Sequence, residues 1–119
     1  MVAESPRVSR GDVWWVDMGE PIGSEPGYRR PAVVLQSNYF NHTELNTVIV
    51  VALTTNLRLA AFPGNVLLSK RKTGLTKESV VNVTQVATVD RSQLYDRCGH
   101  LDPDSMGRVA DGVRMVLDL

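Results

Sequence analysis

Short apolar runs separated by Gly, Pro and polar residues dominate the chain, and this pattern predicts β-strands joined by turns. The most continuous run, TVIVVAL at residues 47–53, is typical of a strand covered on both faces. Pro31 opens another run, and proline is tolerated at the first residue of a strand because its missing N–H costs little there. Strands are predicted over residues 13–16, 31–37, 47–53, 65–69, 79–89 and 95–101.

The periodicity becomes helical near the C-terminus. Asp102 is a suitable N-cap, and Pro103 suits the first helical position, where its missing N–H costs nothing. Apolar residues then recur at helical spacing, at Met106, Val109, Val113 and Val116. We therefore predict a mainly β protein: a small half-open barrel of five to seven short antiparallel strands, closed by one amphipathic C-terminal helix.

The longest predicted strand, residues 79–89, carries one polar residue where an apolar one is expected. Side chains alternate across a strand, so Gln85 shares a face with apolar residues at 81, 83, 87 and 89. A polar side chain there must be hydrogen-bonded, lie beside a bulge that re-aims it, or face a site. The sequence leaves these three explanations open.

The chain is short enough to form one domain. Residues 1–10 are polar and broken by Pro6, so we expect a flexible N-terminal arm followed by a single domain over residues 11–119. Residues 19–27, GEPIGSEPG, predict a long loop. No run approaches the roughly 18 apolar residues that span a bilayer, and Cys98 is the single cysteine. We expect a cytoplasmic protein with no membrane partner.

Charge and motif content exclude several functional classes. The formal net charge is +0 and the sequence pI is about 6.7, so any nucleic-acid site must be built from local charge. No glycine-rich phosphate loop, cysteine pair or cluster of carboxylates at ligand spacing occurs, so no cofactor and no metal are expected. His42 and His100 are interpreted as surface histidines, and Cys98 as a small strand residue rather than a nucleophile.

The remaining candidates for chemistry lie at strand ends and in the long loop. Arg29 and Arg30 open one strand, and Thr54 closes another. An arginine offers a permanent charge in a fork that matches phosphate oxygens, and a threonine hydroxyl can donate to or accept from a phosphate or ribose. Together they could hold a phosphodiester. Judged from these residues alone, a solvated strand start is the simpler interpretation of the two arginines.

The chain also resembles the MazF/PemK (Kid) family of toxin endoribonucleases. The segments that carry the resemblance occur in order from Gly11 to Leu119: GDVWWVDMG, YRRPAVVLQSN, VIVVALTTN, FPGNVLLS and SVVNVTQVATVDRSQL, followed by the C-terminal helix. The resemblance implies an SH3-like barrel, a homodimer and sequence-specific, metal-independent cleavage of single-stranded RNA at short sequences. In the implied reaction the ribose 2′-hydroxyl attacks the adjacent phosphate and leaves a 2′,3′-cyclic phosphate and a 5′-hydroxyl.

The resemblance also assigns roles to residues. It implies that Arg30 stabilises phosphate charge and protonates the leaving oxygen, and that Thr54 positions the phosphate or hydroxyl. Ser24 and Gln85 match positions that contact RNA in the family, and Arg29 adds positive charge beside Arg30. Glu25 is a hypothetical RNA contact and general base. The implied partner is an antitoxin whose acidic, disordered tail would fold onto a basic cleft, supplied here by Arg29, Arg30 and Lys70–Lys72.

Two other functional hypotheses compete with that of an RNA-cleaving toxin. A toxin of the same fold that poisons DNA gyrase is similar, but its contacts centre on a tryptophan near the chain end, where this sequence has MVLDL. Trp14 and Trp15 instead lie in the first strand and are interpreted as core or dimer-interface residues. A non-catalytic barrel that binds an acidic protein would use the same arginines.

Overall fold

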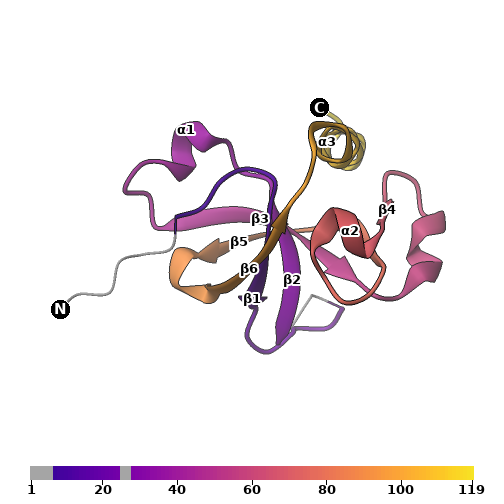
Figure 1. Ribbon diagram of the computed structural model, residues 1–119, viewed down its shortest axis with the longest axis horizontal. Coiled ribbons are helices and arrows are strands. Elements are labelled where there is room, and N and C mark those ends of the chain that lie inside the picture. The colour runs from indigo at the N-terminus through magenta and orange to yellow at the C-terminus, as the bar shows by residue number, and fades with distance from the viewer. Residues whose placement is uncertain (1–6, 25–27) are drawn as a thin grey trace.

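The computed structural model describes residues 7–24 and 28–119. Its six strands form one antiparallel sheet in the order β4-β5-β3-β2-β1-β6 (Figure 1). The strands are β1 (Asp12–Asp17), β2 (Arg29–Val34), β3 (Thr47–Thr54), β4 (Val66–Leu68), β5 (Ser79–Asp90) and β6 (Leu94–His100). The helical segments are α1 (Asn38–Asn41), η1 (Leu57–Ala61), α2 (Lys70–Thr73), η2 (Arg91–Gln93) and α3 (Pro103–Leu117).

The sheet curls until the segment that follows β4 lies against β6, at the other edge of the sheet. A Cβ atom on Gly74 would lie 2.1 Å from the carbonyl oxygen of Cys98, and one on Gly99 would lie 2.5 Å from that of Thr73. Glycine permits this close approach of two backbones because it has no Cβ. Together with α3, this curled sheet confirms the predicted mainly β half-barrel with a C-terminal helix.

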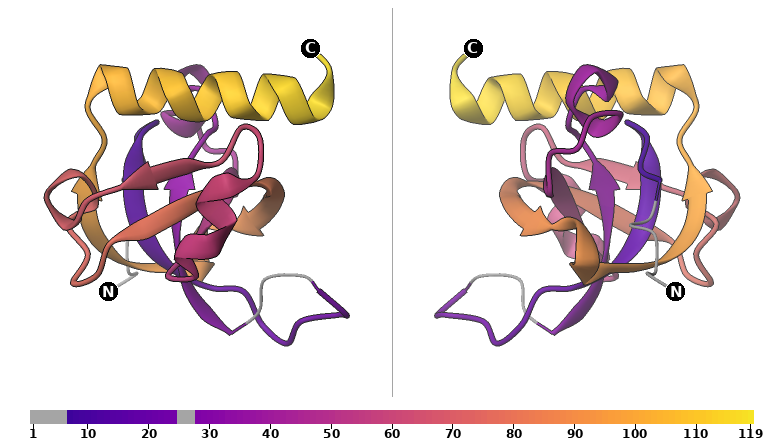
Figure 2. Two further views of the ribbon diagram at one scale, coloured as in Figure 1. Left: turned by 90° about the vertical axis from the view of Figure 1, so that its right-hand side faces the viewer. Right: turned by 90° about the vertical axis from the view of Figure 1, so that its left-hand side faces the viewer.

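Helix α3 covers the first of two hydrophobic clusters (Figure 2). The Asp102 side chain accepts a hydrogen bond from the Ser105 N–H at 2.7 Å, so it caps the helix as predicted. Val109 and Val113 are buried against the sheet. Val116 is 39% exposed, so the predicted apolar stripe is buried only as far as Val113. In Figure 2 the C-terminal end of α3 extends past the strands, which explains this exposure.

The second cluster lies on the other side of the strands and includes Trp14, Val16, Val34 and Leu94. Val8 is fully buried in it. Of the arm predicted over residues 1–10, residues 1–6 lie outside the described part of the chain, so the division into an arm and a domain stays a prediction.

Strand β5 does not keep a single alternation along its length. Its register against β3 shifts between the pairs Val51–Val86 and Leu53–Val81. Val81 therefore faces the first cluster, whereas Val89 faces the second. The prediction that the odd-numbered residues of this strand share one face is wrong, because an irregularity of this kind changes the face that the later residues present.

The remaining segments are short. The basic residues from Lys70 onward form the single turn of α2, and the polar segment after β2 contains α1. No helix in the described ranges is long and apolar enough to cross a membrane.

Candidate active site

Arg30 and Thr54 lie at the same end of two paired strands. The antiparallel pairing of β2 with β3 extends to Ala32 and Ala52, and Arg30 and Thr54 follow at the same end of the two strands, where both line the same two pockets. On its other side Arg30 pairs with Val16 of β1. The sequence thus brings an arginine and a threonine together, although 24 positions separate them, through the pairing of two apolar strands.

A small pocket of about 150 Å³ collects four of the predicted site residues: Ser24, Arg30, Thr54 and Gln85. Asn82 and Leu59 also line it, and sequence reasoning did not select them. The amide of Gln85 makes no hydrogen bond to a described residue. Of the three explanations for Gln85, the structure supports two, because this residue lies beside the register shift of β5 and also faces a pocket.

The polar groups of this pocket are oriented by local hydrogen bonds. The Asn56 N–H donates to Thr54 Oγ1 at 3.1 Å, so the Thr54 hydroxyl already serves as an acceptor and keeps its own hydrogen for a ligand. The Thr84 hydroxyl donates to Asn82 Oδ1 at 3.1 Å, which leaves the Asn82 NH₂ group as a donor. Both arrangements present donors, and donors suit an anionic ligand.

Arg30 adds a donor that is already removed from solvent. Its Nε atom is buried and has no hydrogen-bond partner among the described residues. A buried polar atom without a partner is costly, and such atoms concentrate where a ligand supplies the missing contact. The Arg30 guanidinium therefore points to an anion-binding position beside the Thr54 hydroxyl.

A larger pocket of about 480 Å³ adjoins the small one and shares Arg30, Leu53 and Thr54 with it. Arg29 lines this larger pocket, and its guanidinium carbon lies 5.4 Å from the centre of the Tyr95 ring. That distance permits a cation–π interaction, which orients the Arg29 side chain. Other residues of the pocket that sequence reasoning did not assign to a site are Trp15, Tyr28, Thr76 and Lys77.

Several other residues considered in the sequence analysis lie elsewhere or cannot be placed. Glu25 falls outside the described residues. Lys70–Lys72 lines neither pocket, and the Lys72 Nζ atom is 2.5 Å from Asp102 Oδ2, where it bridges α2 and α3. Of the two tryptophans, Trp14 is a core residue as predicted, whereas Trp15 faces the larger pocket.

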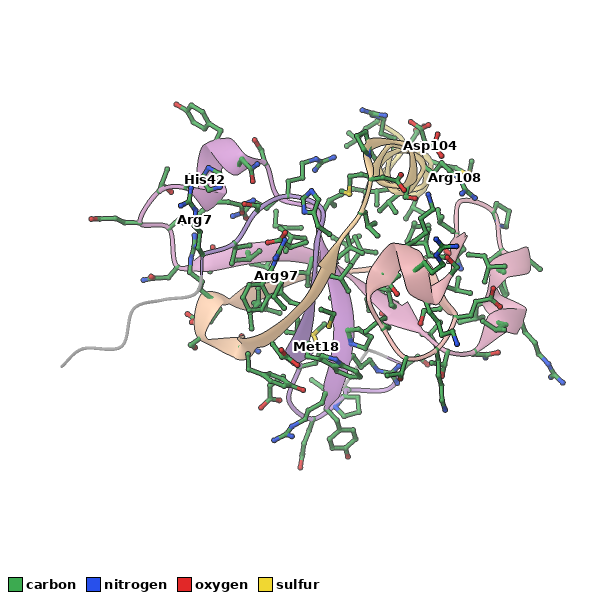
Figure 3. The ribbon with its side chains drawn as sticks, in the orientation of Figure 1. Arg7, Met18, His42, Arg97, Asp104 and Arg108 are labelled. Carbon is green, nitrogen blue, oxygen red and sulfur yellow. The ribbon has the colours of Figure 1, made fainter. Side chains whose placement is uncertain are left out.

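The histidines and the cysteine lie away from both pockets. His42 lies beside Arg7 near α1 (Figure 3), where the two line a separate pocket of about 550 Å³ that includes neither Arg30 nor Thr54. The His100 Nδ1 atom is 2.8 Å from Asp12 Oδ1. Burial raises the pKa of the Cys98 thiol, which keeps it protonated and supports its interpretation as a strand residue.

No described residue lining the two pockets is a carboxylate or an imidazole. In the described ranges, no group of three or more His, Cys, Asp and Glu side chains is placed to hold a metal ion. The local chemistry is therefore that of cations, hydroxyls and amides, which can bind a phosphodiester and stabilise charge that develops on it.

Fold and site together define a small curled half-barrel with cation-lined pockets where its strands end. A family model described as "PemK-like, MazF-like toxin of type II toxin-antitoxin system" matches residues 9–117, so the chain belongs to this family. The family predicted from the sequence is confirmed.

Relatives and solved structures agree with this assignment. The chain is 46% identical over 112 residues to "Endoribonuclease MazF6" of Mycobacterium tuberculosis, covering 94% of this chain and 98% of that protein. It is 34% identical over 112 residues to "Endoribonuclease EndoA" of Bacillus subtilis, covering 94% and 96%. A solved mycobacterial endoribonuclease in complex with its cognate antitoxin is 25% identical, with a TM-score of 0.77 and coverage of 94% and 96%. The two relatives are endoribonucleases, which confirms the enzyme class predicted from the resemblance.

Proposed function

We propose that this chain is a sequence-specific toxin endoribonuclease that cleaves single-stranded RNA, messenger RNA in particular, at the junction of the two pockets, and so inhibits translation and growth. One observation carries the proposal: the Arg30 Nε atom is buried without a hydrogen-bond partner among the described residues, and Arg30 and Thr54 line both pockets. A phosphodiester placed there would satisfy Arg30 and accept a hydrogen bond from Thr54. The curated endoribonuclease relatives support this choice of substrate.

In the proposed reaction, the ribose 2′-oxygen forms a bond to phosphorus while the bond from phosphorus to the 5′-oxygen breaks. The 2′-hydroxyl loses its proton and the departing 5′-oxygen gains one, so the products are a 2′,3′-cyclic phosphate and a 5′-hydroxyl. Arg30 stabilises the extra negative charge on the phosphate oxygens and donates a hydrogen bond toward the leaving oxygen. Thr54 holds a phosphate oxygen, and Ser24 and Gln85 bind the neighbouring nucleotides.

The proposed reaction uses no metal ion, because the arginine and the hydroxyl supply the charge stabilisation and orientation that a metal would otherwise provide. Glu25, the hypothetical base, directly follows Ser24 in the sequence, and Ser24 lines the small pocket. Glu25→Gln therefore tests that role. A rate lowered at neutral pH and partly restored at high pH is expected if the Glu25 carboxylate takes the 2′-hydroxyl proton.

The proposed partners are an antitoxin and a second copy of the chain. The solved complex of a mycobacterial relative with its cognate antitoxin supports an antitoxin partner. An acidic antitoxin tail suits the Arg29 and Arg30 end of the sheet, where it would block RNA. Several apolar residues near the C-terminus are exposed and favour a homodimer: Met115, Val116, Leu117 and Leu119.

The decisive experiment incubates the purified protein with a long unstructured RNA in excess EDTA and maps the fragment ends. Discrete cuts with cyclic-phosphate and 5′-hydroxyl ends are expected. Arg30→Ala should lower the rate by about a hundredfold or more, because it removes a charge contact to the transition state. Thr54→Val should lower it strongly and Thr54→Ser only slightly, since serine restores the hydroxyl donor.

Circular dichroism of each variant checks that the barrel is folded. A folded wild-type protein that cleaves none of several RNAs would contradict the proposal and favour gyrase poisoning or acidic-protein binding instead. Cleavage retained in folded Arg30→Ala would contradict the site assignment.

A further inference from the structure

A further pocket lies at the opposite end of β1 from the candidate active site. The pairing of β1 places Asp12 beside His100 at one end and Asp17 beside Arg29 at the other. At about 3.3 Å per residue, these two ends are roughly 17 Å apart. The pocket at the Asp12 end, called the distal pocket here, has a volume of about 370 Å³ and is lined by Arg7, Ser9, Asp12, Arg97 and His100. No described residue lines both the distal pocket and a pocket that contains Arg30, so the two sites are separate.

The imidazole ring of His100 is held in place within this pocket. Its Nδ1 atom donates to the Asp12 carboxylate, which places the hydrogen of a neutral ring on Nδ1. The ring also packs over the Gly11 backbone, because a Cβ atom on Gly11 would lie 3.3 Å from His100 Cε1. The Nε2 atom makes no hydrogen bond to a described residue, and the side chain is 49% exposed. A fixed imidazole with one nitrogen available can therefore bind a ligand.

The charges of the distal pocket favour an anion. The Arg97 Nε atom is 3.3 Å from Asp12 Oδ1, so Arg97 offsets the charge of the buried Asp12 carboxylate. The terminal nitrogen atoms of Arg97 make no hydrogen bond to a described residue. Arg7 is exposed and forms neither an ion pair nor a hydrogen bond with a described residue, so its charge is not offset. Protonation of His100 would add a second positive charge.

A neighbouring pocket of about 550 Å³ shares Arg7 with the distal pocket and contains the other histidine. The Ser9 Oγ and His42 Nε2 atoms are 3.3 Å apart, which joins the two pockets. The Arg91 guanidinium donates to two backbone carbonyls of residues 41–45 and so fixes the segment that carries His42. Figure 3 shows Arg7 and His42 near α1, with Arg97 on β6. Basic side chains from three separate segments therefore meet around Arg7.

We propose that the distal pocket is a second anion-binding site, which takes a phosphate group. The planar forks of Arg7 and Arg97 match phosphate oxygens, and His100 Nε2 donates a hydrogen bond when the ring is protonated. Donors from three side chains suit a tetrahedral anion with three free oxygens better than a planar carboxylate with two. Glu44 lines the neighbouring pocket and disfavours an anion there. The site shares no residue with the proposed cleavage site at Arg30, so it does not depend on the ribonuclease proposal.

The first test titrates the protein with inorganic phosphate. The ring nitrogen signals of His100 are followed by NMR at constant ionic strength and about pH 6.5, where an imidazole is partly protonated. We expect a saturable shift with phosphate and none with chloride. Arg7→Gln should weaken the binding about fivefold or more, because it removes a charged donor without breaking a contact of the fold. Arg7→Lys keeps the charge and should retain more of the affinity.

Two control variants separate this site from other cations. Arg108→Gln removes an exposed charge on α3, outside the distal pocket (Figure 3). Arg30→Ala removes the proposed phosphate contact of the cleavage site. Both should leave the phosphate affinity measured at His100 within about twofold of the wild-type value, because screening weakens the effect of charges beyond about 10 Å. No saturable shift at His100, or an equal affinity in Arg7→Gln, would overturn the inference.

The second test identifies the source of the phosphate. A 2′-O-methyl RNA lacks the attacking hydroxyl, so it binds without being cleaved. If the site holds the RNA backbone, this RNA should shift His100 at concentrations at least tenfold below those of inorganic phosphate, and Arg7→Gln should lower the salt dependence of its binding by about one ion. If the site holds a small phosphate compound, a nucleoside monophosphate should shift His100 at least as well as the RNA. Either result supports a phosphate site.

The same signals distinguish a competing ligand and the two proposals. A glutamate-rich peptide that shifts His100 at lower concentration than every phosphate compound would overturn the inference and assign the pocket to carboxylates. Phosphate binding at His100 in a folded protein that cleaves no RNA would refute the ribonuclease proposal and retain the distal pocket. RNA cleavage without phosphate binding at His100 would do the reverse.

Discussion

The His100 Nδ1 atom lies 2.8 Å from the Asp12 Oδ1 atom, which joins the end of β6 to the start of β1. The Asp12 side chain is only 3% exposed, and three further donors surround it. The Ser9 N–H, the Trp14 indole N–H and the Arg97 Nε–H approach its oxygens at 2.9, 3.3 and 3.3 Å. One buried carboxylate therefore ties the segment before β1 to both strands.

This network predicts a large effect of Asp12→Ala on stability. The substitution leaves the Ser9 amide and the Trp14 indole without their acceptor, so the free energy of unfolding should fall by about 2–4 kcal/mol. Urea unfolding measures it. Asp111→Ala is the control, because Asp111 is exposed and forms an ion pair with Arg114 on α3. Its substitution should lower the free energy of unfolding by no more than about 0.5 kcal/mol. Equal losses in the two variants would contradict the structural role of Asp12.

Two glycines of α3 should respond oppositely to alanine. A Cβ on Gly112 would lie 2.1 Å from the Gly64 carbonyl oxygen, whereas one on Gly107 would meet nothing within 4 Å. Helix propensity alone favours alanine by about 1 kcal/mol at either position. We expect Gly107→Ala to raise the melting temperature and Gly112→Ala to lower it, as measured by calorimetry. Stabilisation by Gly112→Ala would show that α3 does not pack closely on the segment before β4.

Stability should depend on pH through Asp102. The Lys72 ammonium, followed by the Ser105 amide, lowers the pKa of this carboxyl from 3.8 to about 2. A lowered folded-state pKa stabilises the fold above the unfolded value, and that contribution is lost as the pH falls from about 4 toward 2. The stability difference between wild type and Asp102→Asn, measured by urea unfolding, should shrink across this window. Lys72→Met should reduce the same pH dependence, and a pH-independent difference would contradict the assignment.

Arg29 should contribute to RNA affinity rather than to the chemical step. It lines the larger pocket and stacks on Tyr95, so Arg29→Ala should raise KM severalfold with little change in kcat and weaken the salt dependence of binding. Arg108→Ala is the control, because Arg108 lies on α3 (Figure 3) and lines neither pocket. Cleavage rates at several salt concentrations measure both variants. A loss confined to kcat would instead place Arg29 in the reaction itself.

Much of the fold could be predicted from the sequence because its determinants are local. Apolar runs, the proline at the start of β2 and the Asp102–Pro103 helix start each act within a few residues, and the predicted strands and helix occur where these signals lie. Arg30 and Thr54 could be listed as candidates, since each stands at the polar end of an apolar run, but only the family resemblance assigned them to the chemistry. Their roles in RNA cleavage stay predictions.

The tertiary structure alone decided how these elements are assembled into a site. The register shift in β5 depends on pairing with β3, and it re-aims Gln85 and brings Asn82 into the small pocket. The larger pocket joins residues from β1, β2, β3 and the segment before β5, which only the curling of the sheet brings together. Local periodicity determines which residues form a strand. The neighbours of each strand and the cavities between them depend on long-range contacts that no short stretch of sequence encodes.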